Sequence, residues 1–243
     1  MPPPDQNTLA SGSIAAILPA AGSGRRFGAA SNKLFAELAG KPLWFHAASR
    51  LADSQSVGRV VLVISQADEA VFRKRYAAMV EQLGVELVLG GSERTDSVQA
   101  GLDHLADDPM VQWVAIHDAA RPLVRSKDIT AVFAVAQRTG AAVLATPVPG
   151  TVKRGKLKSG GSRTVDRREL WLALTPQVFS IGLLKQAYQK HNGRPATDDA
   201  QLVERIGRDV TLVQGSADNL KITYPEDLSV AEAILATQFH QSE

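Results

Sequence analysis

The stretch IAAILPAAGSGRRFG, residues 14–28, joins an apolar run to a glycine-rich loop with two adjacent arginines. The apolar run is typical of a strand that is buried on both faces of a sheet. Glycines after such a strand let the backbone approach a ligand closely and leave amide N–H groups free for phosphate oxygens. Arg25, Arg26 and Lys33 add cations to the same loop, and guanidinium groups match the geometry of phosphate. The stretch therefore predicts a strand followed by a phosphate-binding loop.

The loop fits neither of two common phosphate-binding patterns. A dinucleotide fingerprint needs G-x-G-x-x-G, but the third glycine, Gly28, comes one residue late. A Walker A loop needs G-x-x-x-x-G-K, and no register of the loop glycines supplies it. A simple glycine turn with solvated arginines is the alternative.

Two distant residues favour a ligand-binding loop. Asp118 follows the apolar run WVAI (113–116), where a carboxylate can hold Mg²⁺ beside bound phosphates, although it could also cap a turn. Lys221 lies in a predicted short strand, where an exposed edge lysine is the alternative. His117 precedes Asp118, and we expect a structural role for it.

Short apolar runs alternate with segments of helical period along the chain. One such segment has Phe72, Tyr76, Met79, Val80 and Leu83 on one side, which predicts a helix. This alternation predicts an α/β fold, Rossmann-like and three-layered, with a mainly parallel twisted sheet between helices. The predicted strands are 14–18, 60–64, 85–89, 113–116 and 141–145.

Length and composition narrow the class of protein. We expect one domain over residues 13–243 of the 243-residue chain, after a disordered tail at 1–12. The net charge of +2 is too small to indicate wholesale binding to nucleic acid or membranes. No cysteine is present, which excludes disulfides and thiolate catalysis. The apolar runs are too short for a membrane span, and we expect a cytoplasmic protein.

The segment 148–170 interrupts the alternation. Residues 150–170 are rich in lysine and arginine around Ser159-Gly160-Gly161, which predicts a hairpin with a glycine turn. A two-stranded hairpin buries little by itself, so we expect this β-arm to project and to pack on a second subunit. Near the C-terminus, the residues 224–227 predict the start of a last helix, with Pro225 at its first position.

The sequence resembles the 2-C-methyl-D-erythritol 4-phosphate cytidylyltransferases of the non-mevalonate isoprenoid pathway from about residue 14 to residue 240. The resemblance rests on ordered blocks, which are more specific together than any one alone. They are LPAAGSGRRFG (18–28) with Lys33, GGSERTDSVQAGL (90–102), HDAARP (117–122), TVDR (164–167), ALTPQ (173–177), ATDD (196–199) and DNLKIT (218–223). The resemblance implies a nucleotidyltransferase fold, a homodimer joined through the β-arms, CTP as a substrate and a divalent metal ion such as Mg²⁺.

The resemblance also implies roles for particular residues. Arg26 and Lys33 would bracket the α-phosphate of CTP, and Asp118 would hold Mg²⁺. Gly91 and Ser97 would help to bind the base and ribose. The loop after the first strand would cradle the nucleotide, through Pro19, Ala20, Ala21, Gly22, Gly24 and Arg25. The second substrate, methylerythritol phosphate, would be bound by Thr151, Arg167, Thr175, Thr197 and Lys221, of which Thr151 and Arg167 would come from the partner's arm. Arg26, Lys33, Arg167 and Lys221 would be the catalytic residues.

Two positions depart from the family pattern. The family usually has proline before the loop lysine and glutamine after it, whereas this chain reads Asn32-Lys33-Leu34, which we expect to loosen the loop. Ser92 stands where an acid often follows the double glycine. We expect altered nucleotide affinity but not a lost reaction.

Three other functions compete with this interpretation. The nearest is a cytidylyltransferase for another polyol phosphate, such as ribitol 5-phosphate. A nucleic-acid-binding module could use the basic arm, but that arm lacks the interleaved aromatic residues of a single-strand platform. A nicotinamide dehydrogenase is disfavoured by the glycine spacing and by the lack of a ribose-binding acid about 20 residues further on.

Overall fold

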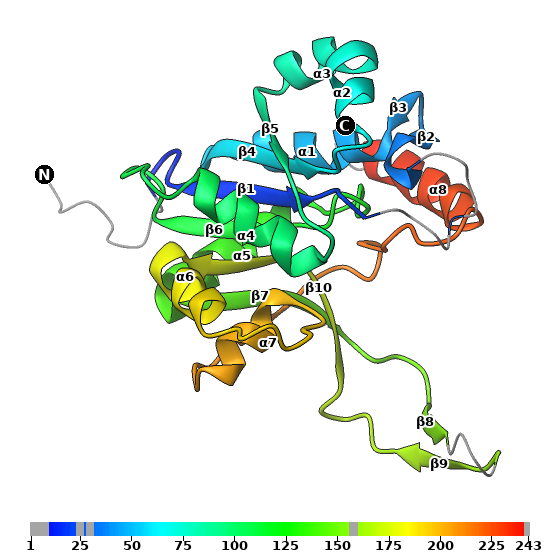
Figure 1. The fold of residues 1–243 in the computed structure, drawn as a ribbon. Helices are drawn as coiled ribbons and strands as arrows, with labels where there is room; N and C mark the ends of the chain where they lie inside the picture. The colour runs from blue at the N-terminus through cyan, green and yellow to red at the C-terminus, as the bar shows by residue number, and fades with distance from the viewer. Residues whose placement is uncertain (1–9, 23–26, 28–31, 156–159, 241–243) are drawn as a thin grey trace, which may run out of the picture.

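The computed structural model describes residues 10–22, 27, 32–155 and 160–240. In this part of the chain a seven-stranded sheet lies between helices, and a hairpin projects from one end of it (Figure 1). The strands are β1 (Ile14–Pro19), β2 (Glu37–Leu38), β3 (Lys41–Pro42), β4 (Val57–Ile64), β5 (Val85–Leu89), β6 (Trp113–Ile116), β7 (Ala141–Pro147), β8 (Val152–Gly155), β9 (Ser162–Val165), β10 (Trp171–Ser180) and β11 (Thr211–Gln214). The helices are α1 (Leu43–Ala52), α2 (Glu69–Arg75), α3 (Ala77–Gln82), α4 (Arg94–His104), α5 (Ser126–Thr139), α6 (Ile181–Gln189), α7 (Asp199–Arg205) and α8 (Asp227–His240), with a 3-10 turn η2 at Lys33–Phe35.

The main sheet is mostly parallel, as the sequence predicts. Its strand order is β11-β7-β10-β6-β1-β4-β5, and only β10 runs antiparallel to its neighbours, β6 and β7. The five strands predicted from apolar runs are all present. The strands β10 and β11 were not predicted, because β10 contains Pro176 and begins with exposed residues, and β11 is a short edge strand.

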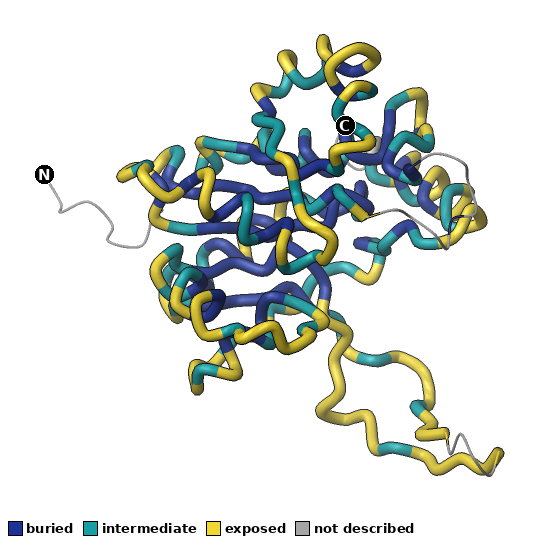
Figure 2. Tube along the Cα trace, viewed as in Figure 1, coloured by how far each residue is buried: buried dark blue, intermediate teal, exposed yellow. Residues whose placement is uncertain are grey.

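Side chains of the central strands alternate between two apolar clusters, one on each face of the sheet. In β1, Ile14, Ala16 and Leu18 pack on the side of α1 and α5, while Ala15 and Ile17 pack on the side of α4, α6 and α7. The central strands are accordingly the most continuously buried part of the chain (Figure 2). This alternation confirms the three-layer fold.

The helix predicted across residues 72–83 is divided in two. Tyr76 leaves helical geometry (φ −113°, ψ 10°) between α2 and α3. Its ring packs against Phe35, Trp44 and Phe72, at centroid distances of 5.4, 5.8 and 5.9 Å. The periodicity therefore reflects two short helices that share one aromatic cluster.

Hydrogen bonds hold the segments near both ends of the described chain. Residues 1–9 of the expected tail lie outside the described residues, whereas Ser11 Oγ and Gly12 N both donate to Gln55 O at 3.1 Å, so residues 11 and 12 contact the loop before β4. The last helix begins at Asp227, two residues after Pro225. The Asp227 carboxylate accepts hydrogen bonds from the backbone N–H groups of Thr223 and Tyr224 at 2.7 and 2.8 Å and so fixes the turn before α8.

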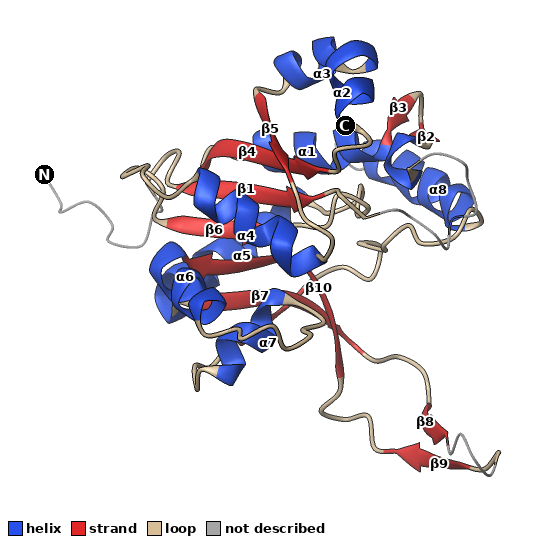
Figure 3. Ribbon diagram, viewed as in Figure 1, coloured by secondary structure: helices blue, strands red, loops and turns tan. Residues whose placement is uncertain are grey.

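The predicted hairpin is the antiparallel pair β8 and β9, whose register joins Val152 to Val165. It stands away from the main sheet and is mostly exposed (Figures 2 and 3). Gly160 has φ +66°, which only glycine adopts readily, while residues 156–159 lie outside the described part. Large apolar side chains are exposed where the arm joins β10, at Leu170, Trp171 and Leu172. Among the helices described, none has the length and apolar character needed to cross a membrane.

Candidate functional site

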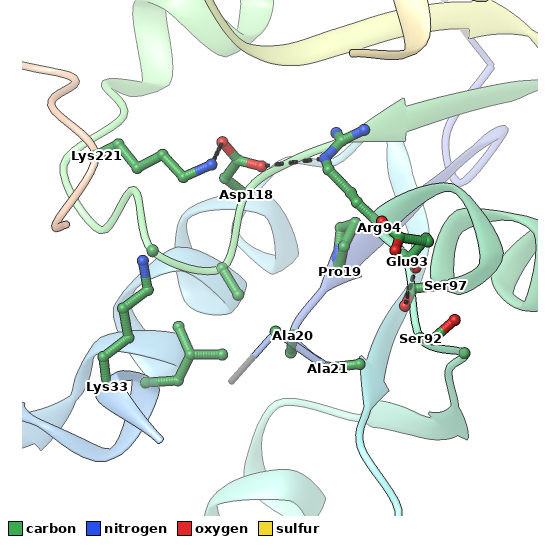
Figure 4. Close-up of a pocket in the computed structure, with 15 residues that line it drawn as sticks. Pro19, Ala20, Ala21, Lys33, Ser92, Glu93, Arg94, Ser97, Asp118 and Lys221 are labelled. Atoms are coloured by element: carbon green, nitrogen blue, oxygen red, sulfur yellow. Dashed lines mark hydrogen bonds and ion pairs between the residues drawn. The ribbon is translucent and has the colours of Figure 1, made fainter. Parts of the chain in front are cut away.

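Two adjoining pockets lie at the ends of the sheet strands. The first lies among the loops that follow β1, β5 and β6, the turn η2, the start of α4 and the segment before α8. It is lined by Pro19, Ala20, Ala21, Gly22, Lys33, Leu34, Gly91, Ser92, Glu93, Arg94, Ser97, Asp118, Ala119, Ala120 and Lys221. The second is lined by Arg94, Asp118, Arg121, Ala173, Leu174, Thr175, Gln177, Thr197, Asp198 and Lys221. Arg94, Asp118 and Lys221 line both pockets and lie in a row between them (Figure 4). The site is therefore at the carboxyl ends of the parallel strands, where α/β sheets bind ligands.

The loop after β1 forms one wall of the first pocket. Ala20 N donates to Val63 O of the neighbouring strand at 2.8 Å, so the strand pairing continues to the point where the loop leaves the sheet. The predicted residues Pro19, Ala20, Ala21 and Gly22 all line this pocket. The predicted residues Gly24, Arg25 and Arg26 lie outside the described residues.

The opposite wall comes from the double glycine and the start of α4. A Cβ at Gly90 would lie 2.6 Å from Ser97 Oγ, and a Cβ at Gly91 would lie 2.4 Å from Asp96 Cβ, so both positions require glycine. A capping box starts the helix, in which the Asp96 carboxylate accepts from Glu93 N at 3.0 Å and the Glu93 side chain accepts from the backbone of Asp96. The predicted residues Gly91 and Ser97 both line the pocket.

Asn32 ties the lysine-bearing turn to the end of β1 and to the start of α2. Its Nδ2 donates to Ala20 O at 3.3 Å and to Asp68 Oδ2 at 2.9 Å, and its Oδ1 accepts from Leu34 N at 3.1 Å. Asn32 itself is thus firmly held, while most of the loop that it was expected to loosen lies outside the described residues. Lys33 follows and donates from Nζ to Ile222 O at 2.8 Å, which directs it across the first pocket.

Ser92, the second departure from the family pattern, is exposed at the rim of the first pocket. Its hydroxyl donates to Asp96 Oδ2 at 3.2 Å and so adds a contact to the capping box.

Asp118 is the electrostatic centre of the site. Its Oδ2 lies 2.9 Å from Lys221 Nζ and 3.3 Å from Arg121 Nε, and its Oδ1 lies 3.6 Å from Arg94 Nε. Burial by itself would raise the pKa of Asp118, but these three cations outweigh burial and hold the pKa well below its ordinary value. The carboxylate is therefore charged at neutral pH and fixes cations around it.

Lys221 is placed by its neighbours and not by a strand. The segment 217–223 is irregular, which corrects the prediction of a short strand. Ile222 N donates to Ala120 O at 2.9 Å, and Arg121 Nη1 donates to Asn219 O at 2.7 Å, so both flanks are fixed to the loop after β6. Lys221 is thereby held against Asp118.

Thr175 and His117 form a buried support beneath the second pocket. Thr175 Oγ1 accepts from Asp118 N at 3.1 Å and lies 3.0 Å from His117 Nδ1, while His117 Nε2 lies 3.0 Å from Arg121 O. Because a carbonyl can only accept, Nε2 carries the proton and Nδ1 accepts from the threonine hydroxyl. Burial lowers the pKa of His117 to about 4, so the ring is neutral. The structural role expected for His117 is confirmed.

The remaining predicted residues divide between the pockets and the arm. Thr197 lines the second pocket beside Thr175 and Lys221. Thr151 and Arg167 lie on the exposed arm and line neither pocket of their own chain. The guanidinium of Arg167 donates to Val148 O at 2.9 Å and also to Pro149 O.

The described residues do not form a metal site of their own. None of them gather into a group of three or more histidine, cysteine, aspartate or glutamate side chains able to hold an ion. Within the described part of the chain a single carboxylate, that of Asp118, faces both pockets, and Lys221 already contacts its Oδ2. This donor set fits only an ion whose other ligands are phosphate oxygens and water, which is how Mg²⁺ is commonly held.

Several residues of the site were not assigned roles from the sequence. Four residues line the pockets and fall within the sequence blocks quoted above, but no role was predicted for them: Arg94, Arg121, Gln177 and Asp198. No local pattern distinguishes them from surface residues. Some of their partners are far away in the chain, as Arg94 and Asp199 illustrate with an ion pair of 2.7 Å.

Comparisons with known proteins show the family of the chain. The family model for 2-C-methyl-D-erythritol 4-phosphate cytidylyltransferase matches residues 14–237. A protein of that name from Rhodopirellula baltica is 54% identical over 232 residues, covering 92% of this chain and 95% of the relative. Another from Chromobacterium violaceum is 44% identical over 228 residues, covering 92% and 98%. The crystal structure of the Thermus thermophilus enzyme superposes with a TM-score of 0.73 at 35% identity, covering 90% of this chain and 97% of that one. The chain belongs to the 2-C-methyl-D-erythritol 4-phosphate cytidylyltransferase family.

Proposed function

We propose that the protein transfers CMP from CTP to 2-C-methyl-D-erythritol 4-phosphate and releases pyrophosphate, a step of non-mevalonate isoprenoid synthesis. The observation that carries this proposal is the row of Arg94, Asp118 and Lys221 between two pockets. A transfer between two phosphate esters needs two anion-binding compartments that meet where the phosphorus atom changes partners. Family membership supplies the identity of the substrates.

The chemistry needs cations and positioning more than a nucleophilic side chain. An oxygen of the acceptor phosphate attacks the α-phosphorus of CTP in line, a P–O bond forms, and the bond to the β-phosphate oxygen breaks. Charge on the five-coordinate phosphorus is stabilised by preorganised cations. Lys33 approaches from the first pocket and Lys221 from the boundary with the second, while Asp118 holds Lys221 in place. Arg26 is proposed to join Lys33 at the α-phosphate on the strength of the family resemblance.

We also propose Mg²⁺ as the metal ion of the reaction. It would neutralise phosphate charge and orient the triphosphate, with Asp118 as its protein ligand. Omission of the metal with a chelator should abolish turnover, and Mg²⁺ should restore it. Full activity in the chelated enzyme would remove the ion from the mechanism.

The second substrate is proposed to be held by residues from two chains. Thr175, Thr197 and Lys221 line the second pocket, whereas Thr151 and Arg167 lie on the exposed arm. The proposal that the arm of a partner brings Thr151 and Arg167 to this pocket is supported by the exposed apolar residues 170–172 at the base of the arm. We propose the cytoplasm as the compartment, since both substrates are phosphorylated metabolites of the cell interior.

A pyrophosphate-release screen tests the reaction. Four nucleoside triphosphates are each paired with methylerythritol phosphate, ribitol 5-phosphate and erythritol 4-phosphate. We expect fast turnover only for the pair of CTP and methylerythritol phosphate. This turnover should be lost in Lys33→Ala. It should be unchanged in Lys127→Ala, because Lys127 is exposed and lines neither pocket. Faster turnover with ribitol 5-phosphate would change the acceptor, and faster turnover with another triphosphate would change the nucleotide.

A complementation experiment tests the shared site. Lys33→Ala and Arg167→Ala each inactivate every site of a homodimer, but a hybrid dimer has one site with both native residues. Mixing the two variants under exchange conditions should restore up to about a quarter of the native rate, because half of the dimers are hybrids with one working site. Light scattering gives the oligomeric state. A monomer, or a dimer whose mixtures stay inactive, would refute the sharing.

A further inference from the structure

Arg94 lies at the junction of the two pockets and forms an ion pair with a fully buried carboxylate, that of Asp199. It is the first residue of α4, and its side chain is 28% exposed. Its Nη1 lies 2.7 Å from Asp199 Oδ2, and its Nε lies 3.6 Å from Asp118 Oδ1. The guanidinium is thus held between two carboxylates, one that faces the pockets and one that does not. Despite burial, which lowers the pKa of an arginine, these carboxylates raise the pKa of Arg94 above its ordinary value.

Asp199 faces away from both pockets and is completely buried. Its Oδ1 accepts a hydrogen bond of 2.6 Å from the Tyr188 hydroxyl, and its Oδ2 contacts Arg94. Burial raises the pKa of Tyr188, and the charge of Asp199 raises it further, so the hydroxyl stays protonated and donates. A buried charge is costly unless it is paired, and here Arg94 supplies the opposite charge beside Oδ2 while Tyr188 supplies the hydrogen bond to Oδ1.

The backbone around Asp199 is fixed to the sheet. Gln177 of β10 accepts through Oε1 from Asp199 N at 3.2 Å and from Ala200 N at 3.0 Å, and it donates through Nε2 to Asp198 Oδ2 at 3.0 Å. These bonds satisfy the first N–H groups of α7, whose positive end also favours the carboxylate of Asp199. The carboxylate therefore has a fixed position relative to the second pocket, which Gln177 and Asp198 line.

Competition among cations gives Asp199 a specific task. Asp118 already contacts Lys221 at 2.9 Å and Arg121 at 3.3 Å. Without Asp199, Arg94 would have only Asp118 as a counter-charge and would crowd Lys221 there. With Asp199 present, Arg94 keeps its distance of 3.6 Å from Asp118. Its planar fork then remains at the junction, with no described partner for Nη2.

We propose that Asp199, hydrogen-bonded by Tyr188, is a positioning residue that holds Arg94 at the junction of the two pockets, where Arg94 binds phosphate oxygens during transfer. This inference rests on the proposed function for its kinetic consequences. Asp199 touches no substrate, and its effect on the reaction passes through Arg94.

The test compares Asp199→Asn, Arg94→Lys and the double variant with the native enzyme. Asp199→Asn should lower kcat by about tenfold, because a displaced guanidinium no longer meets the transferring phosphate. In the Arg94→Lys background, the same change should alter kcat by less than about twofold, because Asp199 has lost the group through which it acts. An equal drop in both backgrounds, or a native kcat in Asp199→Asn, would overturn the proposal.

Two further variants separate positioning from stability. Tyr188→Phe keeps the ring and removes only the hydroxyl. It should lower kcat by about threefold, and it should also lower the free energy of unfolding in urea, because Asp199 Oδ1 loses its hydrogen bond. Asp128→Asn removes another buried carboxylate, which accepts from Ser216 N at 2.9 Å and lines neither pocket. It should reduce stability and leave kcat unchanged. A loss of kcat in Asp128→Asn as large as that in Asp199→Asn would make the effect merely structural.

Binding of inorganic pyrophosphate, measured by calorimetry, distinguishes failure of this inference from failure of the proposed function. Its affinity should fall in Asp199→Asn and in Arg94→Lys, and should fall no further in the double variant. A native enzyme that binds pyrophosphate in this pattern but transfers no CMP would refute the function and support the positioning. An active enzyme with additive losses in kcat and in affinity would do the reverse.

Discussion

Acidification should destabilise the protein through His117 before it affects the carboxylates. The ring is fully buried, Nε2 donates to Arg121 O, and Nδ1 accepts from Thr175. Protonation would place a second N–H against the threonine hydroxyl, which already serves as acceptor for Asp118 N, and would charge a group that has no water around it. The neutral form is therefore strongly preferred in the folded protein.

The size of the effect follows from the two pKa values. The pKa of His117 is about 4 in the folded protein and about 6.5 in the unfolded chain. The folded state is therefore fully stable above pH 6.5 and loses stability as the pH falls toward 4, because the unfolded chain binds the proton first. The complete loss corresponds to about 3 kcal/mol at about 1.4 kcal/mol per pH unit, and about 2 kcal/mol of it appears between pH 8 and pH 5.

Urea unfolding at pH 8, 7, 6 and 5 measures this loss. The pKa of His46 is also lowered by burial and acts in the same direction, so a His46→Gln variant gives its share. The pKa values of Asp118 and Glu86 are lowered, so the stability that these carboxylates contribute is lost only at lower pH. They therefore do not affect the measurement between pH 8 and pH 5. In His117→Gln the decline between pH 8 and pH 5 should shrink by about 2 kcal/mol. If the free energy of unfolding of the native protein changes by less than about 0.5 kcal/mol over this range, His117 does not control the response to acid.

Three further predictions concern the site and the core. Asn32→Ala should lower the free energy of unfolding by about 2 to 3 kcal/mol, because three hydrogen bonds are lost and one goes to a charged acceptor, which urea unfolding would detect. Lys221→Ala should reduce kcat by roughly a hundredfold in the pyrophosphate assay, because the reaction loses this cation and Asp118 loses its nearest counter-charge. A raised KM with an unchanged kcat would contradict this prediction. Gly101→Ala should destabilise by about 1 to 3 kcal/mol, since its Cβ would lie 2.8 Å from Ile17 Cγ2, and an unchanged melting temperature would show that the core adapts.

The sequence was sufficient for those parts of the fold that depend on local patterns. The five parallel strands are continuous apolar runs, and the sheet order places their ends together, so Asp118 could be predicted beside the loop after β1. The strand β10 was missed because proline and exposed residues obscure its pattern. It is a strand because its second half is buried between β6 and β7, which only the tertiary structure determines.

Residues of the candidate site could be predicted where the side chain has one common chemical role. They could not be predicted where that role depends on a partner residue far away in the chain. Lys33 was predicted as a cation of the loop after β1, and Lys221 was assigned through the family resemblance. Both line the first pocket, although Lys221 is held by an irregular segment instead of a strand. The pairing of Arg94 with Asp199 joins residues 105 positions apart, and nothing in either local sequence indicates it. The hydrogen bonds of Asn32 to Ala20 and Asp68 were not predicted, because these residues come close to it only in the folded chain.

The strand β10 runs from Trp171 to Ser180, and its register on β7 shifts between Ala173 and Gln177. Its exposed first residues adjoin the arm, and its buried later residues include Thr175 and Gln177, which line the second pocket. A compound lodged beside the exposed end could therefore act as an inhibitor without resembling either reactant. Selection for binders at residues 170–172 offers a route to such molecules that natural nucleotides cannot outcompete.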